Sequence, residues 1–227
     1  MDQERKLLPD ATARCTKRWS RRDMLKTGAF VGAAGAIGIP AIVKRVDAAM
    51  PTAAMPNVAM NDAKVLNGAL FYEHQAIWAY GFAAGKLTST TVGKAVLAIA
   101  LANQADHKKH RDTLAAVITQ LGGIPTAAQK QYDVSAYLKA GEGALDSDVN
   151  IAKLALALET DAAIAYGREI AKLKTPALVT AGASIGATEA SHATLIRSAF
   201  KALGVDLAVV PASFVSADTR SAWVLKV

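Results

Sequence analysis

Four stretches of this chain place apolar side chains at alternating steps of three and four residues, the spacing that keeps side chains on one face of an α-helix. Each apolar stripe is interrupted near its middle by residues with carboxylate, imidazole or amide side chains. A carboxylate on a buried face needs a partner, because removing its charge from water is costly. The interruptions are Glu73, then Asn103 with His107 and His110, then Glu159, then Glu189 with His192. The chain must therefore fold so that several helices share polar groups in one core.

The helical periodicity predicts an all-α fold, because no segment shows the alternation of a β-strand. The first and third connections between helices are short, so each pair of helices is expected to form an antiparallel hairpin, and the middle connection is a long crossover. Asn61 is the predicted N-cap of the first helix. The expected helices cover about residues 61–86, 90–121, 148–173 and 176–203. This arrangement predicts a four-helix bundle over residues 61–203.

The two predicted hairpins are similar in sequence. The segment "EHQAIWAYG" (73–81) and the segment "ETDAAIAYG" (159–167) share a glutamate and then Ile-x-Ala-Tyr-Gly at matching offsets. When the second helices of the two hairpins are aligned from their final Leu-Gly, His107 pairs with Glu189 and His110 pairs with His192. The second hairpin therefore looks like a copy of the first.

This pattern resembles the ferritin-like superfamily, and more closely its exported bacterial members of unassigned function. Ferritin-like carboxylate proteins hold two iron or manganese ions with one Glu from each of two helices and a Glu-x-x-His from each of the other two. The resemblance implies a non-haem metal site in the bundle core, with one or two divalent ions and iron as the first expectation, and an oxygen- or peroxide-linked oxidase activity. No catalytic residue can be assigned from it. The predicted metal ligands are Glu73, His107, His110, Glu159, Glu189 and His192.

The second helix departs from the family pattern, because "HKKH" places His107 where the family has a glutamate. A carboxylate can bridge two cations, whereas a neutral imidazole offers one nitrogen to one metal. In an alternative register Gln104 replaces the glutamate and His107 is the histidine of "QADH". Both registers leave three core carboxylates. Two ions with less charge compensation, one ion of a common transition metal such as manganese, or a structural zinc all stay open.

Other interpretations do not involve a metal. Glu73 or Glu159 could pair with an arginine, with Arg111 and Arg197 as candidates, and a bundle without metal could act as an interaction module of the cell envelope. Metal ions nevertheless stay the expected binding partners of this chain, and dimer formation is an open alternative.

Several residues near the stripes have open roles. Tyr80 and Tyr166 are expected to be core aromatics whose hydroxyls need partners, with a redox role as the alternative. Asp106, Asp112 and Asp161 lie one position off the stripes, where they would either orient imidazoles or carry surface charge.

The first 48 residues resemble an export signal of the twin-arginine type, which carries folded proteins across the bacterial inner membrane. "SRRDMLK" (20–26) precedes the mildly apolar segment "TGAFVGAAGAIGIPAIV" (27–43). That segment has 17 residues and reaches roughly 25 Å as a helix, which is short of a bilayer core of roughly 30 Å. We expect cleavage after Ala48 and a periplasmic or cell-envelope location. The alternative is an uncleaved leader, and only in that case would the protein contact the membrane. Residues 49–60 then form a linker, and residues 204–227 a tail packed on the bundle.

The leader also carries most of the excess positive charge. Of 26 basic and 19 acidic residues in the chain, 10 and 5 lie in residues 1–48, which leaves 16 and 14. The remaining chain is close to neutral, which argues against a nucleic-acid partner. The only cysteine, Cys15, also lies in the leader. The rest of the chain must therefore be stabilised by packing and not by disulfides.

Overall fold

The structure is a computed structural model that describes residues 56–227, and every regular element within that range is helical. The prediction of an all-α fold is confirmed. None of the helices in the described range is both long and apolar enough to cross a membrane. The predicted leader and the first residues of the predicted linker lie outside the described residues. The helices are α3 (Pro56–Ala84), α4 (Thr91–Gln120), α5 (Ser135–Lys139), α6 (Asp148–Glu169), η2 (Ile170–Lys172), α7 (Pro176–Ala202), η3 (Ala217–Thr219) and α8 (Arg220–Trp223).

The first helix begins earlier than the sequence predicts. It starts at Pro56, where a proline is well tolerated because the first helical N–H has no partner in the helix. Residues 56–60 of the predicted linker are therefore helical, and the prediction of Asn61 as the N-cap is wrong. The Asn61 amide instead donates a hydrogen bond to the carbonyl oxygen of Lys172 at 3.2 Å.

The starts and ends of the other long helices have local causes. The Thr90 side chain caps α4 by accepting a hydrogen bond from the N–H of Gly93, and Ser147 caps α6 in the same way. Both α4 and α7 are followed directly by Leu-Gly, and the two glycines, Gly122 and Gly204, have φ of 80° and 92°. This left-handed conformation is cheap only for glycine and ends a helix. The Leu-Gly pair that aligns the two hairpins is thus a shared stop signal.

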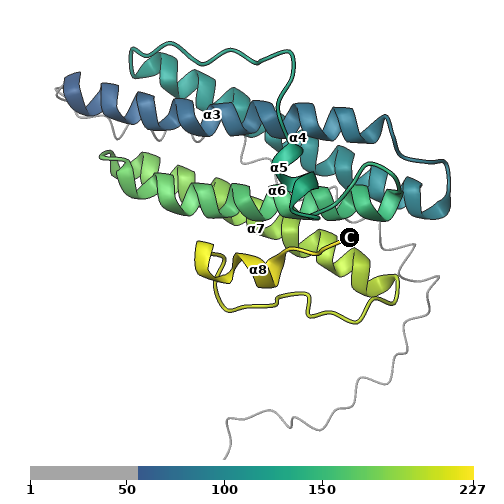
Figure 1. Cartoon of the computed structure of the whole chain (residues 1–227). Coiled ribbons are helices and arrows are strands. Elements are labelled where there is room, and N and C mark those ends of the chain that lie inside the picture. Colours follow the sequence, from purple (N-terminus) through teal and green to yellow (C-terminus); the bar gives the residue numbers. More distant parts are fainter. Residues whose placement is uncertain (1–55) are drawn as a thin grey trace, which may run out of the picture. The chain divides into compact units, whose positions relative to one another are not determined.

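The helices α3 and α4 form one antiparallel hairpin, and α6 and α7 form the other (Figure 1). Equivalent aspartates tie each hairpin to the turn of the other. Asp62 on α3 accepts hydrogen bonds from the N–H groups of Lys174 and Thr175 at 2.8 and 3.0 Å. Asp148 on α6 accepts from the N–H of Thr88 at 2.8 Å. The internal repeat is therefore visible in how the hairpins pack as well as in their sequences.

Two apolar clusters fill the bundle, one toward each end. The first joins the start of α3, the end of α4 and the start of α7, with Leu70, Ile118 and Leu178 fully buried. The second joins the start of α6 to the end of α7, with Leu156 and Phe200 at its centre. The predicted polar interruptions lie at the middle of the four helices, between these two clusters.

The C-terminal segment packs along the outside of α6 and α7 (Figure 1). Trp223 of α8 is buried against the second apolar cluster. Arg220 makes a bidentate ion pair with Glu142 of the crossover and also contacts Asp161 of α6. The N–H of Val227 donates to the carbonyl of Gly141 at 2.9 Å. The tail therefore fastens the crossover to the bundle.

Candidate metal centre

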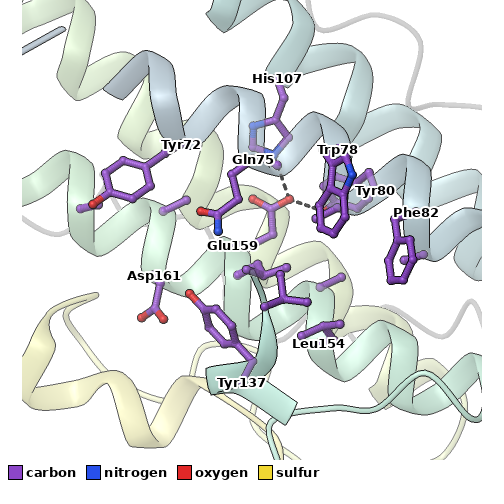
Figure 2. A pocket seen from close by; sticks show the side chains of 18 of the residues that line it. Tyr72, Gln75, Trp78, Tyr80, Phe82, His107, Tyr137, Leu154, Glu159 and Asp161 are labelled. Atoms are coloured by element: carbon purple, nitrogen blue, oxygen red, sulfur yellow. Dashed lines mark hydrogen bonds and ion pairs between the residues drawn. The ribbon is translucent and has the colours of Figure 1, made fainter. Parts of the chain in front are cut away.

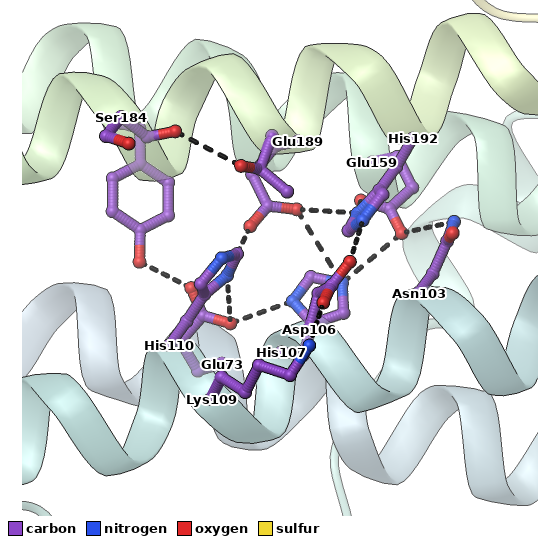
Figure 3. A network of polar contacts seen from close by, with 12 residues as sticks. Glu73, Asn103, Asp106, His107, Lys109, His110, Glu159, Ser184, Glu189 and His192 are labelled. Carbon is purple, nitrogen blue, oxygen red and sulfur yellow. Dashed lines mark hydrogen bonds and ion pairs between the residues drawn. The ribbon is translucent and has the colours of Figure 1, made fainter. Parts of the chain in front are cut away.

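The six predicted ligands meet in one cluster inside the bundle (Figure 3). The three glutamates are at most 2% exposed, His107 is 2% exposed and His192 is 5% exposed. His110 is the most accessible of the six, with 14% of its side chain exposed. Each long helix contributes at least one member because the polar interruption of each apolar stripe faces the shared axis.

His107 lies at the centre of the cluster. Its Nδ1 is 2.8 Å from Glu73 Oε2, its Nε2 is 3.3 Å from Glu159 Oε1, and the same Nε2 is 3.7 Å from Glu189 Oε2. Gln104 lies elsewhere, since its Nε2 donates to the carbonyl of Ile77 at 2.9 Å. The structure therefore supports the register in which His107 stands at the position of the missing glutamate.

The other two histidines lie on either side of Glu189. His110 Nδ1 is 3.0 Å from Glu189 Oε1, and His192 Nδ1 is 3.3 Å from Glu189 Oε2. His192 Nδ1 is also 3.3 Å from Glu159 Oε2. Two overlapping groups of four residues result, in which one ligand atom from each residue lies within 4.8 Å of the others. The groups are Glu73, His107, His110 and Glu189, and His107, Glu159, Glu189 and His192.

Three atoms of this cluster lack a hydrogen-bond partner although they are buried. They are His110 Nδ1 and both carboxylate oxygens of Glu189. The two residues lie at ion-pair distance, but the direction of the contact does not satisfy hydrogen-bond geometry. Buried polar atoms without partners are rare, and imidazole nitrogen and carboxylate oxygen are ligands of iron, manganese and zinc. The residues present therefore fit a divalent transition metal ion.

The pKa values of the cluster show how its charges balance without a metal. Burial by itself lowers the pKa of a histidine, but the neighbouring carboxylates outweigh burial and raise the pKa of His110 to about 9 and that of His192 to about 10. The same balance raises the pKa of His107. For Glu73, burial is outweighed by hydrogen bonds and charge from His107 and His110, and its pKa falls to about 2. Protons on the imidazoles thus compensate the carboxylates in the metal-free protein.

Two tyrosines join the cluster across the repeat. The hydroxyl of Tyr80 on α3 donates to Glu159 on α6, and the hydroxyl of Tyr166 on α6 donates to Glu73 on α3. Asn103 adds donors to Tyr80 at 3.0 Å and to Glu159 at 3.3 Å. Burial and the adjacent glutamate raise the pKa of both phenols. The tyrosines are neutral donors that orient the two glutamates, a role that helix spacing alone does not reveal.

The arginine partners considered from the sequence are not the partners of these glutamates. Arg111 pairs with Asp112 at 2.7 Å. Arg197 is 3% exposed and donates to the carbonyls of Ala208 and Trp223. The glutamates of the cluster are balanced by histidines instead.

Of the three aspartates near the stripes, one reaches the cluster. Asp106 Oδ2 is 3.4 Å from His192 Nε2, on the ring edge opposite Glu159 and Glu189, so Asp106 can orient that imidazole. Asp112 carries surface charge beside Arg111, and Asp161 pairs with Arg220. His74, one position off the stripe, contacts the carbonyl of Thr126 at 3.0 Å, outside the cluster.

Of three comparisons with known proteins, one gave a match. A comparison with curated proteins found no match, and a comparison with solved structures found none either. A family model described as "Ferritin-like domain" matches residues 61–202, which include all six clustered histidines and glutamates. The chain therefore belongs to the ferritin-like family.

Proposed function

We propose that this protein binds one or two divalent transition metal ions, iron by preference, at the centre formed by Glu73, His107, His110, Glu159, Glu189 and His192. The observation that carries the proposal is the pair of overlapping four-residue groups, together with the buried atoms of His110 and Glu189 that have no hydrogen-bond partner. Glu189 belongs to both groups, and neither of its carboxylate oxygens has a hydrogen-bond partner, so Glu189 would serve as a ligand in either group.

Because His107 is shared by the two groups, a first and a second metal ion should bind with different affinities. As a neutral ring His107 serves one metal ion at a time, so only one ion obtains four protein ligands. A second ion would have two glutamates and one histidine. Three carboxylates leave a net charge of about −1 with one ion and about +1 with two, so charge alone favours neither number. We therefore expect one tight and one weaker binding step.

Iron held by these residues would supply electrons for the reduction of dioxygen or peroxide, so an oxidase activity is the catalytic form of the proposal. The chain's own residues bury the ligands and orient them through Tyr80, Tyr166 and Asp106. Binding a metal also requires the imidazoles to lose the protons that they carry in the metal-free cluster.

A second candidate function is metal binding without turnover. The position of His107 favours it, because the bridging carboxylate of the family pattern is missing there. Reaction with oxidant separates the two candidates. Anaerobic protein loaded with Fe(II) should change its near-ultraviolet absorption on exposure to oxygen or peroxide if the centre is an oxidase, and should stay unchanged if it only binds metal.

The decisive experiment is elemental analysis of the purified protein after incubation with Fe(II), Mn(II) or Zn(II) and removal of unbound metal. We expect about two iron ions per chain at excess metal. The Glu189→Ala, His192→Ala double variant should retain almost none, because Glu189 serves both groups. Glu169→Ala is the matched control, since Glu169 pairs with Lys172 at the surface. A wild-type protein without metal would refute the proposal.

The location of the protein forms a separate part of the proposal. The twin-arginine pattern of residues 20–26 supports export to the periplasm or cell envelope, where a folded protein could arrive with its metal already bound. The leader, its cleavage after Ala48 and the bounds of the linker stay predictions.

A further inference from the structure

A cavity of about 290 Å³ lies between α3 and α6, beside α5 of the crossover (Figure 2). Aromatic rings form much of its outer wall, and two of them, Tyr72 and Phe82, are more than 40% exposed. Tyr80, His107 and Glu159 line it from the side of the candidate metal centre. The cavity therefore extends from the surface of the bundle to the buried ligands.

The cavity exists because both repeats have small side chains at the same positions. Ala76 and Ala79 of α3 correspond to Ala162 and Ala165 of α6, counted from the equivalent glutamates, and all four line the cavity. Close-packed interiors rarely leave voids of this size. Larger residues surround these four alanines, so the cavity is confined to this part of the contact between α3 and α6.

The size and walls of the cavity restrict what it can hold. A cavity of about 150 Å³ can hold benzene, so roughly twice that volume can hold two fused rings. Trp78 and Tyr137 provide aromatic surfaces against which a planar ring can pack. Charged side chains of both signs line the cavity, with Glu159 and Asp161 opposed by Arg168. Asp161 also pairs with Arg220. The walls therefore favour a neutral ligand over an ion.

Polar groups at the cavity suit a ligand with a hydroxyl. The carboxamide of Gln75 and the side chain of Glu159 lie on the same side of the cavity in Figure 2, and the Tyr137 hydroxyl lies near Asp161. Pockets for small molecules combine such apolar walls with a few polar groups that fix orientation.

We propose that this cavity binds a neutral aromatic alcohol of one or two rings, placed against the Glu159 and His107 side of the centre. Binding itself does not require a metal. Only the statement that this ligand would lie beside a metal centre rests on the proposed function.

The test is isothermal titration calorimetry of the full chain with 2-naphthol, which measures the dissociation constant and the number of sites with and without bound iron. We expect one site per chain. Ala162→Phe fills the cavity from α6 and should weaken binding at least about tenfold. Ala76→Leu adds less bulk from α3 and should weaken it about fivefold, which keeps the test valid if the phenylalanine variant does not fold. Ala187→Phe, at an exposed position of α7, is the matched control and should bind within about twofold of wild type.

Two results would overturn the inference: no binding to the wild type, or equal affinity in the wild type and in folded Ala162→Phe and Ala76→Leu proteins. Metal content measured on the same samples separates this inference from the proposed function. Metal without naphthol binding would refute only the cavity ligand. Naphthol binding without metal would support the cavity ligand and refute the metal centre.

Discussion

Tyr166 on α6 donates a hydrogen bond to Glu73 on α3, a glutamate of the opposite hairpin. The equivalent bond runs from Tyr80 to Glu159. The two bonds differ in their surroundings, because Asn103 and His107 also contact the Glu159 oxygen that accepts from Tyr80. The Glu73 oxygen that accepts from Tyr166 has no other partner of this kind among residues 56–227.

This asymmetry predicts that Tyr166→Phe destabilises the metal-free protein more than Tyr80→Phe does. Leaving a buried acceptor without a donor costs about 1–3 kcal/mol, and the remaining donors to Glu159 should keep the cost of Tyr80→Phe near about 1 kcal/mol. Urea denaturation of the two variants measures the difference. Equal losses, or a larger loss in Tyr80→Phe, would contradict the hydrogen-bond pattern described above.

Metal binding should stabilise the fold. A metal ion that binds only the folded state at about 100 times its dissociation constant adds about 2.7 kcal/mol. For a domain of this size that raises the melting temperature by about 5–10 °C. Calorimetry with and without added Fe(II) under anaerobic conditions measures the shift. In Glu189→Gln the shift should disappear, whereas Glu169→Gln should behave like the wild type.

The contact between Glu142 and Arg220 predicts a loss of stability in acid. Arg220 donates to both oxygens of Glu142 at 2.8 and 2.7 Å, and this pair, with Lys226, lowers the pKa of Glu142 to about 2. The folded-state pKa is below the unfolded value, so the stabilisation is full above about pH 5 and is lost as the pH falls toward 2. The loss is at most about 3 kcal/mol.

Comparing the wild type with Glu142→Gln isolates this contribution, because all other acidic groups titrate in both proteins. The free energies of unfolding, measured in urea at several pH values, should differ most near pH 7 and converge toward pH 2. A difference that does not change with pH would show that the ion pair is not responsible.

Arg197 should hold the C-terminal tail in place. Its guanidinium donates to the carbonyls of Ala208 and Trp223, two points of the tail that are far apart in sequence. Replacing Arg197 with leucine should cost about 2 kcal/mol, since hydrogen bonds from charged groups are worth about 1.5–3 kcal/mol. Hydrogen exchange should become faster over residues 205–227. Arg111→Leu, which removes a surface pair, should change stability by less than about 0.5 kcal/mol.

The export prediction can be tested through the two adjacent arginines. Replacing Arg21 and Arg22 with lysine keeps the charge but removes the paired guanidinium groups that define the signal type. The full-length protein should then accumulate in the cytoplasm of a bacterial host, as measured by cell fractionation. The same replacement at Arg14 and Arg18 should leave export unchanged. Export of both variants would show that the leader is of another kind.

The sequence determined the helices and the residues of the polar cluster. Steps of three and four residues place Glu73, His107, Glu159 and Glu189 on the buried faces of their helices, because side-chain direction along a helix follows from its turn. The Leu-Gly ending shared by the two hairpins favoured His107 over Gln104 as the residue in place of the missing glutamate. The match of the family model to residues 61–202 agrees with this reading of the chain.

The contacts between atoms of different helices depend on how the helices pack. Spacing along one helix does not show how far neighbouring helices are rotated or shifted. It therefore could not reveal that Tyr166 reaches Glu73, that Asp62 and Asp148 hold opposite turns, or that four alanines leave a cavity beside Glu159. These relationships depend on the packing of two hairpins against each other, which brings together residues that are 60 to more than 100 positions apart in the chain.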